Sequence, residues 1–311
     1  MATVIGLKLD GRRDIVAEAL QDPQSLIAGQ PLYVRRALLM TRKGGACQVT
    51  PWTDAGDPEQ PIYIRPDQVI GMHSPRKDAL TRFKRYWDQR HPTTGAHALP
   101  AVGIADLCDL SQPIVVREPS FRPGNVSAVE LVVINHLVRR IEPLRCFEIG
   151  TFDGRTTLNI ACNAPADVRI HTLDLPPAQI GDTRFAVEDN ERQFIEKEGS
   201  GTRFRGTGLE DKIVQLYGDS ATFDFTAFRG EVDFVFVDGS HAKDYVLSDA
   251  DTAMQLLRRG QDGRPHGLVL FHDYGEWEGV TEALEGLRTS DPGYAGLKHI
   301  EDTTLAILDL T

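Results

Sequence analysis

The stretch Cys146-Phe-Glu-Ile-Gly150-Thr-Phe-Asp-Gly154-Arg-Thr organises the rest of the sequence. An apolar run from Leu144 to Ile149 stops at two glycines spaced G-x-x-x-G, and a helical pattern begins at Arg155. This order predicts a strand, a tight turn and a helix N-terminus, whose free N–H groups attract polar ligand atoms. We expect glycine at both positions because a bound ligand must lie against bare backbone, where a Cβ would obstruct it.

Two carboxylates accompany this loop. Glu148 stands two residues before Gly150, at the end of the predicted strand, and suits a ligand with positive charge or hydroxyl donors. Twenty residues after Gly154, a second apolar run from Val168 to Leu173 ends in Asp174. An acid at about that spacing binds ribose hydroxyls in nucleotide-binding α/β folds. Without it, the glycine loop would be equally consistent with an ordinary turn between a strand and a helix.

Composition limits the class of protein. The 311 residues are enough for one large or two ordinary domains. The hydrophobic share of 41% and the charged share of 25% are typical of a globular protein. Lys and Arg number 34 against 45 Asp and Glu, a net charge of −11. This balance argues against a general affinity for nucleic acid or anionic membrane, although it leaves room for a local basic patch.

Nothing in the sequence indicates export or membrane insertion. The apolar stretch at the N-terminus is too short for a signal peptide, and no run approaches the ~18 apolar residues of a membrane span. The cysteines are scattered without a C-x-x-C pair, and we interpret them as reduced packing residues: Cys47, Cys108, Cys146 and Cys162. We therefore expect a cytoplasmic protein.

Residues 1–90 predict a small α+β domain whose role the sequence does not indicate. A short helix is expected from Asp14 to Leu20, and strands are expected at 32–40, 47–52, 62–65 and 69–72. Ser74-Pro75 then opens a helix with Phe83 and Trp87 on its apolar stripe. The basic side chains of that helix allow contact with RNA or an anionic substrate, a solvated charged face, or a subunit contact.

Residues 91–125 are rich in Pro, Gly and small residues and predict a linker, so the main domain covers 126–311. Ser127 and Glu130 form a capping box at its first helix. Helices are then expected at 185–197, 245–257 and 280–287, and strands at 144–149, 168–173, 212–217, 232–237, 267–271, 297–300 and 304–308. Alternating strands and helices predict a parallel sheet of Rossmann-like α/β class. Only three residues separate the last two strands, which forces them to be antiparallel.

Each of the five predicted parallel strands ends in a glycine, an acid or both: Gly150, Asp174, Asp219, Asp238 and Asp273. In open α/β sheets, ligands bind in the crevice outside the carboxyl ends of the strands, where the strand order reverses. We therefore expect these residues to line one site. Separate locations for Glu148, Asp174 and Asp238 would contradict the whole interpretation.

With these motifs, residues 126–311 resemble a class I S-adenosylmethionine-dependent methyltransferase. The resemblance depends on the motifs at 148–154, Asp174, 218–220, 237–241 and 272–274, together with the antiparallel last strand. It implies a seven-stranded methyltransferase sheet. Within the superfamily the chain is most similar to metal-dependent O-methyltransferases of the catechol and macrolide-sugar type. These methylate a hydroxyl of a small molecule such as a natural product or sugar.

The resemblance also implies roles for individual residues. The cofactor S-adenosylmethionine would be held by Glu148, Gly150, Thr151, Phe152, Gly154, Asp174, Gly218, Asp219, Ser220 and Asp238, with Asp174 at the ribose and Asp219 and Ser220 at the adenine. A divalent metal, Mg²⁺ or Mn²⁺, would be bound by Asp238, His272 and Asp273. The catalytic pair would be His241, as the base, and Asp238.

Chemistry supports these roles. Methyl transfer from a sulfonium is an in-line displacement that needs a deprotonated nucleophile, and a histidine base with a bound cation ionises a hydroxyl near neutral pH. Relatives commonly carry an acid at the position of His272. An imidazole there shifts the preference toward Mn²⁺ or Zn²⁺, or else His272 is not a ligand. His241 has a second interpretation, as a histidine that caps a helix or supports the site from behind.

Three classes remain open. The first is the small-molecule O-methyltransferase. The second is an NAD(P)-dependent oxidoreductase, disfavoured because the loop lacks the G-x-G-x-x-G spacing and because the last strand pair is antiparallel. The third is a methyltransferase fold with other chemistry or a scaffold role. The expected partner is a small-molecule acceptor, and a homo-oligomer such as a dimer is expected, with residues 1–90 as a substrate lid or a dimer contact.

Overall fold

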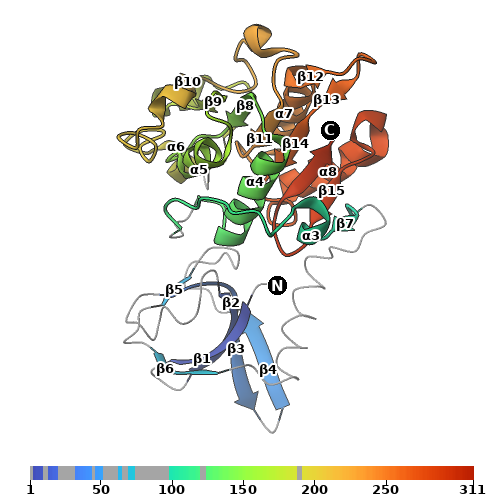
Figure 1. Cartoon of the computed structure of the whole chain (residues 1–311). Helices are drawn as coiled ribbons and strands as arrows, with labels where there is room; N and C mark the ends of the chain where they lie inside the picture. Colours follow the sequence, from blue (N-terminus) through green and yellow to red (C-terminus); the bar gives the residue numbers. More distant parts are fainter. Residues whose placement is uncertain are drawn as a thin grey trace. The chain divides into compact units, whose positions relative to one another are not determined.

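A computed structural model divides the chain into two compact units, Met1–Ala96 and His97–Thr311, which are described separately (Figure 1). In the first unit the structure describes the backbone of six strands. In the second it describes residues 98–119, 124–187 and 191–311. The division at Ala96 differs from the sequence-based scheme, which placed a linker over 91–125.

The first unit contains an antiparallel sheet in the order β4-β3-β2-β1-β6, with β5 paired to β3. Its strands are β1 (Thr3–Leu9), β2 (Arg13–Ala19), β3 (Leu32–Lys43), β4 (Ala46–Pro51), β5 (Ile62–Ile64) and β6 (Val69–His73). The strands expected from residue 32 onward are confirmed. The helix expected from Asp14 to Leu20 is wrong, because these residues form β2 between β1 and β3. The β-branched Ile15 and Val16 favour that strand. The helix expected from Ser74 lies outside the described residues.

The second unit is built on an eight-stranded sheet in the order β10-β9-β8-β11-β14-β16-β15-β7. The first five strands are mutually parallel, and β16 is antiparallel to both of its neighbours. The strands are β7 (Ala101–Val102), β8 (Arg145–Ile149), β9 (Arg169–Asp174), β10 (Ile213–Tyr217), β11 (Phe234–Val237), β14 (Leu268–Phe271), β15 (Lys298–Ile300) and β16 (Ala306–Asp309). The seven predicted strands and their Rossmann-like methyltransferase arrangement are confirmed, and β7 adds an eighth.

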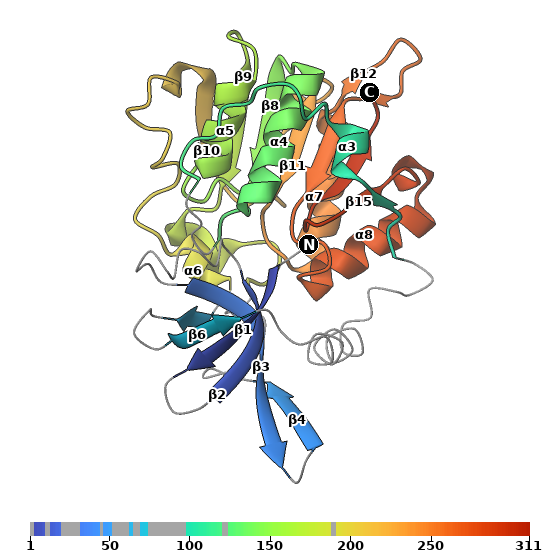
Figure 2. The same ribbon diagram turned by 60° about the horizontal axis from the view of Figure 1, so that its bottom comes forward.

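Helices cover both faces of this sheet (Figure 2). The longer helices are α4 (Ala128–Ile141), α5 (Arg155–Asn163), α7 (Lys243–Leu256) and α8 (Glu278–Ser290). Alternate strand residues enter two apolar cores, so that Phe234 and Phe236 pack with α4 and α5 while Val235 and Val237 pack with α7 and α8. The short elements are α3 (Ile104–Leu107), α6 (Arg192–Ile195), the antiparallel pair β12 (Arg258–Arg259) and β13 (Pro265–His266), and 3₁₀ turns at 177–182, 210–212, 226–228 and 292–294.

The connection between β9 and β10 differs from its prediction. A helix was expected over 185–197, but α6 covers only Arg192–Ile195 and ends at Glu196. The next residues leave the helix because Lys197 and Ser200 turn back to bond with the Asp174 carboxylate, and Gly201 takes a φ of +67°. Tertiary contacts therefore override the helical pattern in this segment.

The segment before α4 also belongs to the second unit. Residues 115–117 lie along α5, where Asn159 and Asn163 bond to both the N–H and C=O groups of Arg117 and Val115. The predicted capping box is present, since the Ser127 side chain accepts from the Glu130 N–H and the Glu130 carboxylate accepts from the Ser127 N–H. The start of α4 is thereby fixed next to the carboxyl ends of the strands.

Candidate active site

The ends of the five parallel strands meet at one edge of the sheet through consecutive backbone hydrogen bonds. Gly150 N–H donates to Leu173 C=O at 2.8 Å, and Gly218 N–H donates to Asp174 C=O at 3.0 Å. On the other side, the Asp238 and His272 N–H groups donate to Ile149 and Val237 at 2.8 and 3.0 Å. The expectation that these tips share one edge is confirmed. Strand order reverses at β8, which lies between β9 and β11, so the tips surround the position where such folds bind ligands.

The two glycines of the first loop are required for a reason that the sequence did not show. Gly150 has a φ of +99°, and a Cβ on it would lie 1.8 Å from the Asp238 carbonyl oxygen. Gly154 has a φ of +85° and caps α5, where a Cβ would lie 2.7 Å from the Gly201 Cα. Protein backbone therefore occupies the space expected for a ligand beside both residues. The glycines allow β8, β11 and the 199–201 segment to pack closely.

Glu148 is buried with one carboxylate oxygen satisfied and the other open. Both Thr157 and Thr172 donate to its Oε2, while none of the described residues bonds to its Oε1. Burial raises the pKa of Glu148 to about 8, and the charges of Asp238 and Asp174 add to the rise against the two threonine hydrogen bonds. An unpaired buried carboxylate oxygen at the end of a central strand fits a cationic or N–H-bearing ligand.

Asp174 lies at the tip of β9 as predicted, but its carboxylate is already engaged. Oδ2 lies 2.7 Å from the Lys197 ammonium and accepts a bond from the Ser200 hydroxyl. Oδ1 accepts a long bond of 3.4 Å from Phe152 N–H. Ligand hydroxyls that reach Asp174 would therefore share it with Lys197 or displace the ammonium.

The tip of β10 carries the predicted Gly218, Asp219 and Ser220. The Asp219 carboxylate accepts from the Ala221 N–H at 3.0 Å, which closes a turn, and from the Arg184 N–H at 2.8 Å. Thr151, in the first loop, bonds to the Thr172 hydroxyl at 2.6 Å and accepts from Gln215 at 2.9 Å. The first three strand tips are thus tied together by side chains as well as by backbone.

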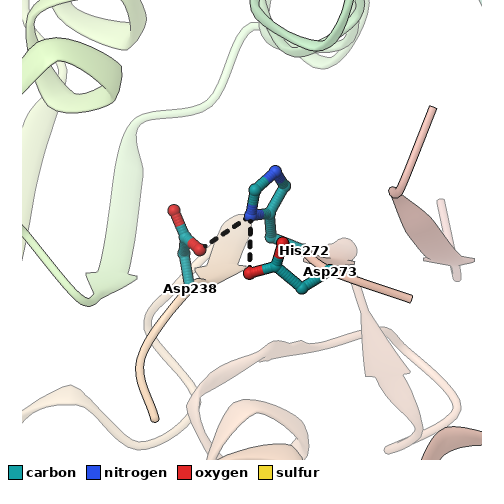
Figure 3. A group of neighbouring side chains, drawn as sticks. All are labelled: Asp238, His272 and Asp273. Carbon is teal, nitrogen blue, oxygen red and sulfur yellow. Dashed lines mark hydrogen bonds and ion pairs between the residues drawn. The ribbon is translucent and has the colours of Figure 1, made fainter. Parts of the chain in front are cut away.

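The structure brings together the three residues predicted as metal ligands (Figure 3). His272 Nδ1 lies 2.9 Å from Asp238 Oδ1 and 3.0 Å from Asp273 Oδ2, and the candidate ligand atoms lie within 4.8 Å of one another. Burial lowers the pKa of His272, but the charges of Asp273, Asp238 and Glu130 outweigh it and hold the pKa well above its usual range. A positive charge is thus stabilised where the three side chains converge. Two carboxylate oxygens and one imidazole nitrogen fit Mn²⁺ or Zn²⁺ better than Mg²⁺.

His241, the predicted base, has a carboxylate at each ring nitrogen. Nδ1 lies 2.8 Å from Glu191 Oε1, and Nε2 lies 2.8 Å from Asp273 Oδ2. The ring stacks on Trp277 with 4.0 Å between centroids and 10° between planes. Burial lowers the pKa of His241, but hydrogen bonds to Asp273 and Glu191 outweigh it and raise the pKa to about 9. The arrangement described here is therefore that of the protonated ring.

Sequence reasoning missed two residues that the structure places against this group. Glu191 contacts His241 from the β9–β10 connection, and it also accepts from the Ser240 hydroxyl at 3.0 and 3.1 Å. Trp277 reaches His241 from the residue that precedes α8. Glu191 lies 50 positions from His241 in a segment without a motif. No local pattern could have identified either of them.

Comparison with known protein families finds one match that covers this edge. Residues 147–274, which contain all of the predicted site residues, match a family model described as a methyltransferase domain. No curated protein matches the chain.

Parts of the chain are also similar to solved structures. One is the O-methyltransferase TomG from Streptomyces achromogenes, involved in tomaymycin synthesis and solved with SAM, which has 21% identity over 60% of this chain and 82% of its own, at a TM-score of 0.41. Another is the SAH-bound methyltransferase PaMTH1 from Podospora anserina, with 15% identity over 78% of this chain and 100% of its own, at a TM-score of 0.44. A third is cofactor-bound Rv0187 from MTB, with 16% identity over 76% of this chain and 99% of its own, at a TM-score of 0.43.

Within the described part of the chain, no helix combines the length and apolar character required to span a membrane.

Proposed function

We propose that the protein transfers a methyl group from S-adenosylmethionine to a hydroxyl of a small molecule. The match of residues 147–274 to a methyltransferase domain and the order of the strands support this proposal. One observation carries the proposal. The loop that would hold the cofactor and the Asp238 cluster that would bind the acceptor are in contact, since Gly150 packs against the Asp238 carbonyl. A methyl donor and an ionisable hydroxyl bound at these two places would be neighbours, as in-line displacement requires.

In this proposal the cofactor lies along the tips of β8, β9 and β10. The open Oε1 of Glu148 would face the cationic methionine part, because a buried carboxylate is stabilised by a cation or donor beside it. Asp174 would accept hydrogen bonds from the ribose hydroxyls. The Lys197 ammonium would then share the Asp174 carboxylate with them or move away from it. Asp219 and Ser220 would border the adenine.

Asp238, His272 and Asp273 would hold a divalent metal, which supplies positive charge that lowers the pKa of a bound hydroxyl. The protein's own contribution is to bring two carboxylates and an imidazole to one point at the ends of two adjacent strands. These residues directly follow the parallel strands β11 and β14, and the His272 N–H donates to the Val237 C=O at 3.0 Å. The acceptor hydroxyl would then be presented beside the cofactor loop.

His241 would receive the proton of the acceptor hydroxyl. Glu191 orients the ring by its bond to Nδ1, and Trp277 fixes the plane of the ring, which leaves Nε2 as the atom that gains or loses the proton. In this proposal the ring would first give up the proton between Nε2 and Asp273 and would then receive the proton of the acceptor hydroxyl.

The test is transfer of a radiolabelled methyl group from S-adenosylmethionine to a panel of phenols, sugars and polyketides, with and without EDTA. We expect label on hydroxyl compounds, loss of labelling in EDTA, and recovery with Mn²⁺. His241→Ala should lose transfer at least about 100-fold. Lys243→Ala is a matched control, because its exposed side chain lies two residues from His241, at the start of α7, and pairs with Glu282.

Calorimetry with S-adenosylmethionine and with NAD separates the proposal from the oxidoreductase alternative. Tight binding of NAD and none of S-adenosylmethionine would refute the proposal. Binding of S-adenosylmethionine without labelling of any acceptor would favour a methyltransferase fold with another task. Full activity in EDTA would refute the metal part of the proposal and leave the methyl transfer itself unchallenged.

A further inference from the structure

Glu130 makes more contacts than its capping box requires. In that motif the glutamate accepts only from the N-cap N–H, here Ser127 at 2.6 Å. Glu130 also accepts from the N–H and the hydroxyl of Thr304 at 2.7 and 2.8 Å, across 174 positions of sequence. Its carboxylate is buried between the start of α4 and the loop that joins β15 to β16. The same carboxylate has a further neighbour in His272.

Oε2 of Glu130 lies 3.4 Å from His272 Nε2, on the side of the ring opposite the cluster. The other ring nitrogen, Nδ1, faces Asp238 and Asp273. A neutral imidazole carries one N–H and one lone pair, and a carboxylate accepts hydrogen bonds without donating any. Without a cation, Asp238 and Asp273 attract a proton to Nδ1 in the same way. Once a cation occupies the cluster, Glu130 would favour the tautomer with its proton on Nε2. That tautomer would present the Nδ1 lone pair to a cation bound between Asp238 and Asp273.

Thr304 extends the same support to the other half of the cluster. Its hydroxyl, which donates to Glu130, also accepts from the Asp273 N–H at 3.3 Å, and its carbonyl accepts from the Tyr274 N–H at 2.9 Å. Asp273 has a φ of +64°, a backbone conformation that non-glycine residues rarely adopt without such support. The Glu130–Thr304 pair thus contacts both His272 and Asp273 from behind.

We propose that Glu130 is a positioning residue of the metal site, which holds His272 in the ring orientation and tautomer that offer Nδ1 as a ligand. This inference rests on the proposed function, because it assumes that Asp238, His272 and Asp273 bind a divalent cation. It also assigns a selectivity. An oriented imidazole donor favours Mn²⁺ over Mg²⁺, whereas a misoriented ring leaves two carboxylates that suit both ions.

The test uses metal alone on the full chain after removal of metal, with Mn²⁺ and Mg²⁺ affinities measured by calorimetry at one pH. Glu130→Gln keeps a residue that can complete the capping box and removes the carboxylate from His272. We expect the Mn²⁺ affinity to fall about 10–100-fold and the Mg²⁺ affinity to fall less, so that the ratio of the two shrinks. Ser127→Ala is the matched control. It removes the other half of the capping box, and its Mn²⁺ affinity should stay within about threefold of the parent.

Two further variants separate orientation from folding. Thr304→Val removes one of the bonds that fix Glu130 and leaves the cap, so it should lower the Mn²⁺ affinity in the same direction even if Glu130→Gln unfolds. In a His272→Asn background no imidazole remains to be oriented, and Glu130→Gln should then lower the Mn²⁺ affinity by less than about threefold. Folding of each variant is checked by circular dichroism.

Three results would overturn the inference in distinguishable ways. If the parent protein binds neither ion, the metal part of the proposed function fails and the inference fails with it. If the parent binds Mn²⁺, and folded Glu130→Gln and Thr304→Val bind it equally well, the metal site stands and only the role of Glu130 is refuted. An equal loss in Ser127→Ala would assign the effect to the cap.

Discussion

Replacement of Glu148 by Gln should change stability and cofactor binding in opposite directions. The carboxyl group is buried at the end of β8, with Thr157 and Thr172 on one oxygen and no bond from the described residues to the other. Burial raises its pKa from an ordinary 4.5 to about 8. The folded protein therefore holds a proton on Glu148 that the unfolded chain releases over this pH range.

This difference in pKa determines how the stability of the protein changes with pH. Stability from this group is fully present below pH 4.5 and is lost as the pH rises through about 8. The interval between the two values, at about 1.4 kcal/mol for each pH unit, amounts to about 5 kcal/mol lost above pH 8. Gln cannot ionise and avoids this loss, but its amide N–H₂ takes the place of Oε1, where it costs about 1–3 kcal/mol if unpaired. The variant should therefore have a free energy of unfolding at pH 9 that is about 2–4 kcal/mol above that of the parent.

Urea unfolding of both proteins from pH 5 to pH 9 measures this difference. We expect the variant to be no more stable than the parent at pH 5 and clearly more stable at pH 9. Affinity for S-adenosylmethionine should behave in the opposite way, because the parent gains a carboxylate partner for the cofactor as Glu148 ionises and the variant does not. A stability difference that stays constant with pH would refute the reasoning on burial. Equal cofactor affinity at pH 9 would refute the proposed contact.

Three other predictions concern single side chains around the same edge. Asp238→Ala should abolish methyl transfer and largely retain cofactor binding, measured by calorimetry. Loss of binding as well would place Asp238 in the cofactor pocket. Gly150→Ala should lower the free energy of unfolding by at least about 3 kcal/mol because its Cβ meets the Asp238 carbonyl, whereas Gly181→Ala, with no atom within 4 Å, should stay within about 0.5 kcal/mol in the same thermal unfolding assay. Lys197→Met should tighten the binding of S-adenosylhomocysteine several-fold, because ribose hydroxyls no longer compete with an ammonium for Asp174. Weaker binding would show that Lys197 orients the carboxylate for the ribose.

The sequence predicted the main sheet because each strand carries its own signal. Apolar runs that end in Gly150, Asp174 or Asp238 give both the strand and the position of its end. Parallel strands with helical crossovers then bring these ends to one edge without further information. The resemblance to metal-dependent methyltransferases grouped Asp238, His272 and Asp273, and the structure places these side chains together.

The wrong predictions share a physical origin in contacts that are distant in sequence. The segment from Asp14 to Leu20 has a short helical pattern, but pairing with strands on both sides determines its structure. The region 185–197 ends its helix early because Lys197 and Ser200 bond to Asp174. The reason given for Gly150 was also wrong, since the neighbour that excludes a Cβ is the backbone of Asp238. None of these neighbours can be read from a local pattern.

The role of Glu191 was likewise beyond reach from the sequence. It contacts His241 from a connection that carries no recognisable motif, and only the folded chain shows that the candidate base has a carboxylate at each nitrogen. Glu130 differs, because the sequence showed its capping box but did not show its contact with His272. A capping pattern predicts one hydrogen bond of a carboxylate and does not predict the partners of its remaining lone pairs.

The two-residue strand β7 has a consequence for how the second unit can be shortened. It covers β15, with the His299 N–H donating to Pro100 at 2.9 Å and the Glu301 N–H donating to Val102 at 3.0 Å. A chain that began at residue 126 would lose this cover and present unpaired donors along an outer strand. Such an edge recruits strands from other molecules, so this shorter chain should aggregate on expression. A chain that begins at residue 97 keeps its own protection and should remain dispersed.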